Sequence, residues 1–462
     1  MVYDLIVIGA GPGGYAAALR AAKNGLKVAV TEAREAGGTC LNRGCVPTKT
    51  LLHSSRIYGD IMNAAGFGVS AENVKVDLTR MFANKREVCE KLSSGIEGLF
   101  KSAKVDYVRG RAKITAPGEV EVENEDGVSK YAAVNILVAT GSVPARPPIP
   151  GLDLPGVLTS DELLEGCDHL YRSIVIIGGG VIGVEMATLY SDLGCEVTII
   201  EGLDRLLPTL DREVGQNLSM IFKKRGVKVF TGATVEKTEN SPEGLTVFFS
   251  SKGKTGAASG EVVLSAIGRR PYFDGLFAPG VSPETDGRRL KVNDRFETSV
   301  KGIYAIGDVC SKIQLAHYAS AQGKAFADML RGIDNPADLS IVPGCIYCRP
   351  EIASVGLTEQ QCKDAGIPAK VGKAVLFSNA RTLIANGERS FMKLVANADT
   401  GVLLGAVLMC ERATDMISEL SEAIANKLTA NQLLIAMRPH PTFEEALTDA
   451  LDDLVGKLNK QL

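Results

Sequence analysis

The sequence predicts an α/β protein that ends in a separate α+β domain. Two observations point to this: a strand, glycine turn, helix and strand unit occurs twice, and the pattern changes after Pro343. The length of 462 residues adds a third. Because a single hydrophobic core stops growing near roughly 250–300 residues, we expect about three domains.

The first repeated unit begins near the N-terminus. Apolar residues at 5–8 predict a strand, the glycines at 9–14 predict a tight turn into an alanine-rich helix, and residues 28–30 predict the next strand. Glu32 follows that strand. The second unit has the same order, with a strand at 174–177, glycines, a helix through Leu189 and a strand at 197–200.

Both units carry the same fingerprint of three glycines and one acid. The matched residues are Gly9, Gly11, Gly14 and Glu32 in the first unit and Gly178, Gly180, Gly183 and Glu201 in the second. Such glycines let the backbone approach a pyrophosphate at a helix N-terminus, and the acid accepts hydrogen bonds from ribose hydroxyls. A lone match is as easily a chance turn, but here strand, helix and acid accompany each match. We therefore predict two Rossmann-like dinucleotide-binding domains.

The acid of the second unit also favours NAD over NADP. The carboxylate of Glu201 would repel a 2′-phosphate, whereas an arginine would attract one. Arg205 lies four residues further on and is the group that weakens this preference.

Two cysteines follow the first unit in the segment GGTCLNRGCVPTK, residues 37–49. Cys40 and Cys45 are five residues apart, so in a regular helix their Cα atoms would lie roughly 8–9 Å apart, beyond disulfide reach. If they form a redox pair, the chain must be distorted between them, which Gly44 and Pro47 permit. The alternative is a pair of buried thiols.

The remaining cysteines and the net charge argue against a metal-binding, nucleic-acid-binding or membrane-binding protein. Cys345 and Cys348 form a CxxC without a second pair or a neighbouring histidine, so we predict no metal site. The net charge of −3 predicts no general attraction to nucleic acid or to membranes. Ten cysteines without a secretion signal suggest a reducing, cytoplasmic setting.

Five motifs in order, GAGPGG, GGTCLNRGCVPTK, GGGVIGVE, GIYAIGD and HPTFEE, resemble those of the dihydrolipoamide dehydrogenase and glutathione reductase family. The resemblance spans nearly the whole chain and implies a homodimer that uses FAD and NAD. Together with prolines at 144–155, Pro271 and Pro343 as boundaries, it implies four domains. They are an FAD-binding domain 1–148, an NAD-binding domain 149–270, a central domain 271–342 that completes the FAD region, and an interface or dimerisation domain 343–462.

Residue roles follow from the same resemblance. Beside the two fingerprints, the residues implied to bind the cofactors are Lys49, Ala112, Thr140, Gly141, Glu185, Val235, Gly268, Asp308 and Ala316. Lys49 would pair with Glu185 near the flavin, although both could instead be exposed helix charges. Asp308 could instead be an ordinary turn residue, after a strand expected at 298–308.

The resemblance also implies the catalytic groups. Cys40 would face the substrate and Cys45 the flavin; His440 would be the acid–base residue, contributed across the dimer and oriented by Glu445. A histidine between prolines could otherwise be a turn filler.

The implied reaction is oxidation of dihydrolipoamide with NAD, on the lipoyl domain of a 2-oxo acid dehydrogenase, acetoin or glycine cleavage complex. Arg438 and Tyr318 depart from the residues usual at their positions in enzymes of that reaction. The alternatives are another disulfide reductase of the glutathione reductase kind, and a flavoprotein NADH oxidase or transhydrogenase that does not use the cysteines.

Overall fold

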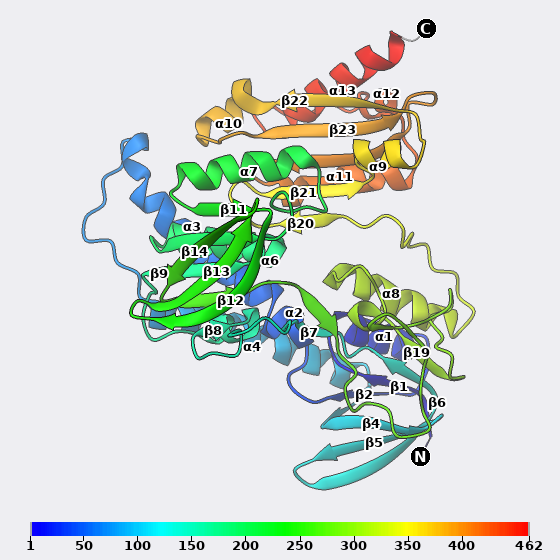
Figure 1. Ribbon diagram of the computed structural model, residues 1–462. Helices are drawn as coiled ribbons and strands as arrows, with labels where there is room; N and C mark the ends of the chain where they lie inside the picture. The colour runs from blue at the N-terminus through cyan, green and yellow to red at the C-terminus, as the bar shows by residue number, and fades with distance from the viewer. Residues whose placement is uncertain (1, 461–462) are drawn as a thin grey trace.

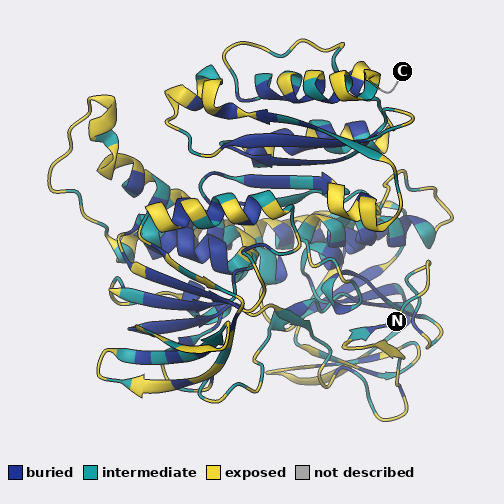
Figure 2. Cartoon of the chain, turned by 45° about the horizontal axis from the view of Figure 1, so that its top comes forward, coloured by how far each residue is buried: buried dark blue, intermediate teal, exposed yellow. Residues whose placement is uncertain are grey.

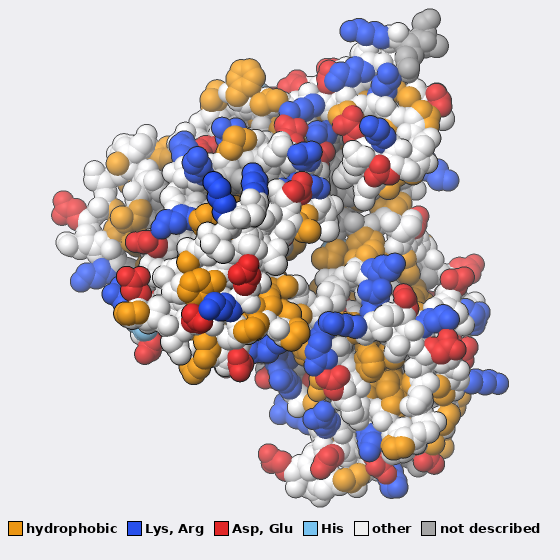
Figure 3. Space-filling model, in the orientation of Figure 1, with side chains coloured by type: hydrophobic (Ala, Val, Ile, Leu, Met, Phe, Trp, Pro, Cys, Tyr) orange, Lys and Arg blue, Asp and Glu red, His pale blue; other side chains and the backbone are white. Residues whose placement is uncertain are grey.

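The fold is described by a computed structural model of residues 2–460. The N-terminal sheet and the C-terminal sheet lie at opposite ends of the molecule, and the second parallel sheet lies beside them (Figure 1). Basic and acidic side chains are intermixed over the face drawn in Figure 3. Among the helices at 2–460, none has the length and apolar character that a membrane crossing needs.

The N-terminal sheet has the strand order β3-β2-β1-β6-β5-β4, and β19 pairs with β6 at its end. The strands are β1 Val2–Ile8, β2 Val28–Glu32, β3 Asp106–Arg109, β4 Arg111–Ala116, β5 Glu119–Asn124, β6 Gly127–Val138 and β19 Ile303–Ala305. Strands β3, β2, β1, β6 and β19 pair in parallel, whereas β4, β5 and β6 form an antiparallel meander. A segment after the second sheet therefore completes the first.

Helices cover the parallel part of this sheet and extend away from it. They are α1 Pro12–Lys23, α2 Gly38–Asn42, α3 Cys45–Met62, α4 Leu78–Ser102 and α8 Ala316–Met329, with a 3₁₀ turn at Ala64–Phe67. Helix α1 packs against α8, and α3 packs against both α4 and α6. Through α3, the segment that carries Cys45 thus contacts α6 Val181–Asp192, a helix of the second parallel sheet's domain.

The second sheet has the order β11-β10-β9-β15-β8 and is parallel throughout. Its strands are β8 Val157–Leu158, β9 Ser173–Ile177, β10 Glu196–Glu201, β11 Lys228–Thr231 and β15 Val262–Ser265. Its helices are α5 Ser160–Glu165, α6 Val181–Asp192 and α7 Arg212–Lys224. An antiparallel meander is inserted before β15 and consists of β12 Ala233–Ser241, β13 Gly244–Ser251 and β14 Lys254–Gly260.

The C-terminal sheet has the order β20-β21-β24-β23-β22 and is antiparallel. Its strands are β20 Gly344–Ile346, β21 Ile352–Gly356, β22 Ala369–Val375, β23 Phe391–Asn397 and β24 Leu403–Met409. Helices α11 Ala413–Ala425 and α13 Glu445–Asn459 pack against it. The central strands β23 and β24 are mostly buried, whereas the outer faces of the helices are exposed (Figure 2). This is the α+β domain that the sequence predicts.

The remaining elements are short. They are β7 Ser142–Pro144, β16 Arg269–Pro271, β17 Thr285–Asp286, β18 Arg289–Leu290, α9 Glu359–Asp364, α10 Ala380–Ile384, α12 Ala430–Leu433 and 3₁₀ turns at Gly307–Val309 and Leu376–Ser378. The strand expected at 298–308 is shorter than predicted, because Ile303 N–H closes a turn onto Val300 O before β19 and Gly307 turns the chain at φ +71° after it. The exact domain limits stay predictions.

A buried ion-pair network joins α7 to the C-terminal sheet. Lys393, on β23, donates to both carboxylate oxygens of Asp211 at 2.9–3.0 Å and lies 3.2 Å from Glu213. Burial works against the ammonium group, but the two carboxylates raise the pKa of Lys393 overall. The network therefore holds a charged lysine between two domains.

We expect Lys393→Met to lower the free energy of unfolding by about 3–5 kcal/mol, because it leaves the largely buried carboxylate of Asp211 without its cation. Adding Asp211→Asn should recover part of this loss while keeping the helix cap. Lys291→Met, which removes an exposed pair with Glu284, is the control and should cost only about 0.2–1 kcal/mol. Urea unfolding curves measure all four proteins; equal losses for the two lysine variants would contradict the expectation.

Candidate active site

In the first glycine fingerprint, β1 and α1 approach each other closely, and two of the positions have no space for a side chain. A Cβ on Gly14 would lie 1.8 Å from the carbonyl oxygen of Gly9, and one on Gly9 would lie 2.4 Å from the carbonyl oxygen of Ala139. Gly9 also has φ +102°, a conformation that side chains disfavour. Gly11 is the N-cap of α1, and a Cβ there would meet only the Cα of Gly38, at 4.0 Å. The turn thus leaves the start of α1 open to a ligand.

The second fingerprint has the same geometry at β9 and α6. A Cβ on Gly183 would lie 1.9 Å from the carbonyl oxygen of Gly178, and one on Gly178 would lie 2.4 Å from that of Ala266. Gly180 caps α6 in open space. Gly14 and Gly183 are therefore packing positions, whereas the first two glycines of each fingerprint line a cavity.

The acids at the ends of β2 and β10 are held by backbone amides. Glu32 accepts from Ala10 N at 2.8 Å and from Arg34 N at 2.9 Å. Glu201 accepts from Gly179 N at 2.6 Å and from Leu203 N at 2.7 Å. These bonds orient both carboxylates at the carboxyl ends of their sheets, where ribose hydroxyls would lie in a fold of this kind.

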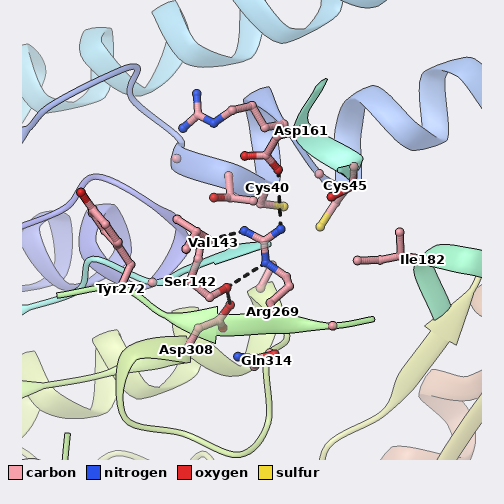
Figure 4. Close-up of a pocket in the computed structure, with 18 of the residues that line it drawn as sticks. Cys40, Cys45, Ser142, Val143, Asp161, Ile182, Arg269, Tyr272, Asp308 and Gln314 are labelled. Carbon is pink, nitrogen blue, oxygen red and sulfur yellow. Dashed lines mark hydrogen bonds and ion pairs between the residues drawn. The ribbon is translucent and has the colours of Figure 1, made fainter. Parts of the chain in front are cut away.

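The two cysteines lie on different helices. Cys40 is in α2, Cys45 is the first residue of α3, and Arg43 and Gly44 lie between the helices. The interruption of the helix that the spacing requires is thus present. Figure 4 shows Cys40 and Cys45 next to each other at the cavity wall.

The two thiols differ in acidity. The hydrogen bond from the Cys40 thiol lowers the pKa of Cys45 to about 7; burial opposes this shift and the Lys49 ammonium adds to it. The same hydrogen bond and burial raise the pKa of Cys40. At neutral pH the pair therefore favours a thiolate on Cys45 and a thiol on Cys40.

Lys49 and Glu185 form a close ion pair across two domains. Lys49 Nζ lies 2.9 Å from Oε1 and 2.8 Å from Oε2 of Glu185. Glu185 is 3% exposed, so the alternative of two exposed helix charges is wrong. The pair lies on the cavity wall beside Cys45.

Asp308 belongs to a polar chain that the sequence did not reveal. Ser142 donates to Asp308 Oδ2 at 2.6 Å, and Arg269 donates to Ser142 Oγ at 2.8 Å and to Ser142 O at 2.7 Å. Arg269 also lies 3.7 Å from Asp161 (Figure 4). Burial raises the pKa of Asp308, against the hydrogen bond from Ser142 and the charge of Arg269. The residue is thus more than an ordinary turn residue.

One cavity of about 1740 Å³ brings most of the predicted residues together. The predicted residues that line it are Gly9, Gly11, Glu32, Cys40, Cys45, Lys49, Ala112, Thr140, Gly141, Gly178, Gly180, Glu185, Glu201, Val235, Gly268, Asp308 and Ala316. Since ordinary small-molecule sites occupy roughly 300–1,000 Å³, the cavity has room for two extended ligands. It runs from the first fingerprint to the second.

His440 and Glu445 lie outside this cavity. His440 Nδ1 is 2.7 Å from Glu445 Oε1, and Glu445 Oε2 accepts from Thr442 N at 2.9 Å. Thr442 and His440 lower the pKa of Glu445. The His440 side chain is 72% exposed on the C-terminal domain. Within one chain the structure does not bring this histidine to the cysteines.

The CxxC residues diverge. Cys345 lines the cavity, whereas Cys348 is buried and its Sγ lies 3.2 Å from Pro350 O. In the part of the chain that the structure describes, no three His, Cys, Asp or Glu side chains are grouped to hold a metal ion.

Comparison with known proteins gives the family. A family model described as pyridine nucleotide-disulphide oxidoreductase matches residues 3–323, and the model of the dimerisation domain of the same family matches residues 342–451. The chain belongs to the pyridine nucleotide-disulphide oxidoreductase family. It is 39% identical to a dihydrolipoyl dehydrogenase of Thermus scotoductus, over 98% of this chain and 97% of that one. It is 38% identical to one of Bacillus subtilis, over 98% and 96%.

Solved structures agree with this family. LpdA from Mycobacterium tuberculosis superposes with a TM-score of 0.89 at 29% identity, covering 97% of this chain and 99% of that chain. RclA from Escherichia coli, described as an HOCl-induced flavoprotein disulfide reductase, superposes with a TM-score of 0.86 at 28% identity over 97% and 99%. This oxidoreductase chain therefore shares its fold with LpdA and with the flavoprotein disulfide reductase RclA along nearly its whole length.

We expect Cys40→Ala to raise the pKa of Cys45 from about 7 toward the ordinary thiol value near 8.5, because the variant removes the hydrogen-bond donor. Cys40→Ser keeps a donor and should change the pKa less. The pH dependence of Cys45 alkylation, followed by peptide mass spectrometry, measures both variants. Identical profiles for the alanine and serine variants would show that Cys40 does not set the acidity of Cys45.

Proposed function

We propose that this oxidoreductase oxidises dihydrolipoamide to lipoamide with NAD, using the Cys40–Cys45 pair and FAD. The observation that carries the proposal is the asymmetric thiol pair in one cavity with both dinucleotide fingerprints. The substrate comes from relatives 37–39% identical over nearly the full chain that bear the name dihydrolipoyl dehydrogenase.

The two cofactors fit the residues at the two ends of the cavity. We assign FAD to the first fingerprint, with Glu32 at a ribose and Asp308 at the ribityl chain, and NAD to the second. The carboxylate of Glu201 would repel a 2′-phosphate on the adenosine ribose, and this supports NAD over NADP. Its amide hydrogen bonds keep the carboxylate in place. FAD held at the first fingerprint would supply the two-electron chemistry between the dithiol and NAD.

The charge of Lys49 beside Cys45 supports a direction for the thiol chemistry. With Cys40 and Cys45 joined as a disulfide, a dihydrolipoyl thiolate attacks Cys40 and expels Cys45, whose leaving thiolate the Lys49 ammonium stabilises. The second dihydrolipoyl thiolate then attacks the substrate sulfur of the mixed disulfide. Lipoamide leaves as the new disulfide, and Cys40 is released. The two cysteines have then gained the two electrons that the substrate lost.

The protons of dihydrolipoamide need an acceptor, and His440 is the group we propose. Its exposed position on the dimerisation domain, outside the cavity, fits a role in which a homodimer brings His440 of the partner subunit to Cys40. Glu445 would hold the ring and stabilise its protonated form. We further propose that the dimer acts on the lipoyl domain of a 2-oxo acid dehydrogenase, acetoin or glycine cleavage complex.

An anaerobic assay with four pairings of substrate and nucleotide tests the proposal. We expect rapid turnover with dihydrolipoamide and NAD, and a catalytic efficiency at least about tenfold lower when NADP replaces NAD. Reduced glutathione should be inactive with either nucleotide. Turnover of glutathione with NADP would instead indicate a glutathione reductase, and a lower Michaelis constant for NADP than for NAD would contradict the role of Glu201.

We expect His440→Gln to lower kcat for dihydrolipoamide oxidation by about 10²–10⁴, the usual contribution of a general base. Reduction of ferricyanide by NADH should continue, because it does not need the proton acceptor for the substrate thiols. His169→Gln is the matched control, since His169 is exposed and lies outside the cavity. Equal dihydrolipoamide turnover by the wild type and His440→Gln would show that His440 is not the proton acceptor.

A further inference from the structure

Tyr347, which lies outside the five motifs of the sequence analysis, contacts both members of the Lys49–Glu185 pair. Its backbone N–H donates to Glu185 Oε1 at 3.0 Å. Its ring lies under the Lys49 ammonium, with Nζ 4.7 Å from the ring centroid. One residue thus binds the anion through its backbone and the cation through its side chain.

The three residues come from three parts of the chain. Lys49 is on α3, Glu185 is on α6, and Tyr347 directly follows β20 of the C-terminal sheet. Arg349, two residues further on, pairs with Asp60 near the end of α3. The turn after β20 is therefore fastened to α3 at two points, and its position relative to Lys49 is fixed.

The two contacts of Tyr347 stabilise the ion pair in different ways, one through the carboxylate of Glu185 and the other through the ammonium of Lys49. The carboxylate of Glu185 is buried, and a buried charge needs hydrogen bonds as well as a counter-ion. Lys49 supplies two of these bonds and Tyr347 N–H a third. The lysine side chain remains 30% exposed, so without a second contact its ammonium has freedom to turn into the cavity. The electron-rich face of the ring limits this freedom.

The position of Lys49 matters because of Cys45. The titratable groups that face Cys45 are Cys40 from α2, Lys49 from α3 and Glu185 from α6. Around Lys49, Cys345 lies on β20 and Tyr347 in the turn after it. Glu185 disfavours a thiolate on Cys45, and Lys49 favours it. If Lys49 moved away from Cys45, its ammonium would offset less of the repulsion between the Glu185 carboxylate and the Cys45 thiolate, and the pKa of Cys45 would rise.

We propose that Tyr347 is a positioning residue whose ring holds the Lys49 ammonium where it stabilises the Cys45 thiolate. The C-terminal domain thereby sets the acidity of a redox cysteine in the FAD-binding part of the chain. The inference rests on the proposed function only in treating Cys45 as a thiolate of the redox pair, and it needs no particular disulfide substrate.

The test is the pH dependence of Cys45 alkylation by iodoacetamide in the FAD-loaded protein with Cys40→Ser, read on the Cys45 peptide by mass spectrometry. Tyr347→Leu removes the ring but keeps the backbone N–H. We expect it to slow alkylation at pH 7 roughly three- to tenfold and to move the profile to higher pH. Tyr347→Phe and Tyr347→Trp keep an aromatic face and should follow the parent profile.

A Lys49→Met background separates positioning from a general structural effect. There, Tyr347→Leu should cause no further change, because the cation that the ring holds is gone. FAD content and molecular mass confirm that each variant is folded. The proposal is overturned if Tyr347→Leu and Tyr347→Phe give the same profile, or if Tyr347→Leu has the same effect with and without Lys49. If the alkylation profiles are as expected but dihydrolipoamide is not turned over, the proposed substrate is wrong and the role of Tyr347 still stands.

Discussion

The rest of the structure depends on a steric constraint at two strand-to-helix turns. At each turn the helix begins so close to its strand that a Cβ on Gly14 or Gly183 would overlap a carbonyl oxygen. The close approach directs the first amides of α1 and α6 toward the carboxyl ends of their sheets. Both sheets turn these ends to one cavity, so two dinucleotides can meet near one pair of cysteines.

Between the two fingerprints, ion pairs and hydrogen bonds of charged side chains connect different parts of the chain. Lys49, Glu185 and Tyr347 join the FAD-binding, NAD-binding and C-terminal parts of the chain within hydrogen-bond or cation–π distance. On the other side, Ser142 and Arg269 tie Asp308 to β7 and β16. Buried polar groups in such networks are costly when one partner is lost, so the site depends on the relative placement of the domains.

The Cys40–Cys45 pair, which we propose as the redox pair, depends on a local irregularity of the chain. The interruption between α2 and α3 brings two thiols together that a continuous helix would keep apart. It also makes them unequal, because one thiol donates to the other and Lys49 favours a negative charge on Cys45. In the exchange that we propose, the Lys49 ammonium also stabilises the thiolate that leaves from Cys45, which gives the exchange a direction.

The sequence by itself determined the features that depend on neighbouring residues: both fingerprints, their acids, the helix interruption at Cys40 and Cys45, and the His440–Glu445 pair, whose spacing already allows contact. The α+β character of the C-terminal part was also predictable from its pattern. Only the tertiary structure decided that β19 completes the first sheet, that Ser142 and Arg269 support Asp308, and that Tyr347 reaches Lys49. These contacts join residues more than 100 positions apart, and their geometry comes from domain packing, which local periodicity and spacing do not encode.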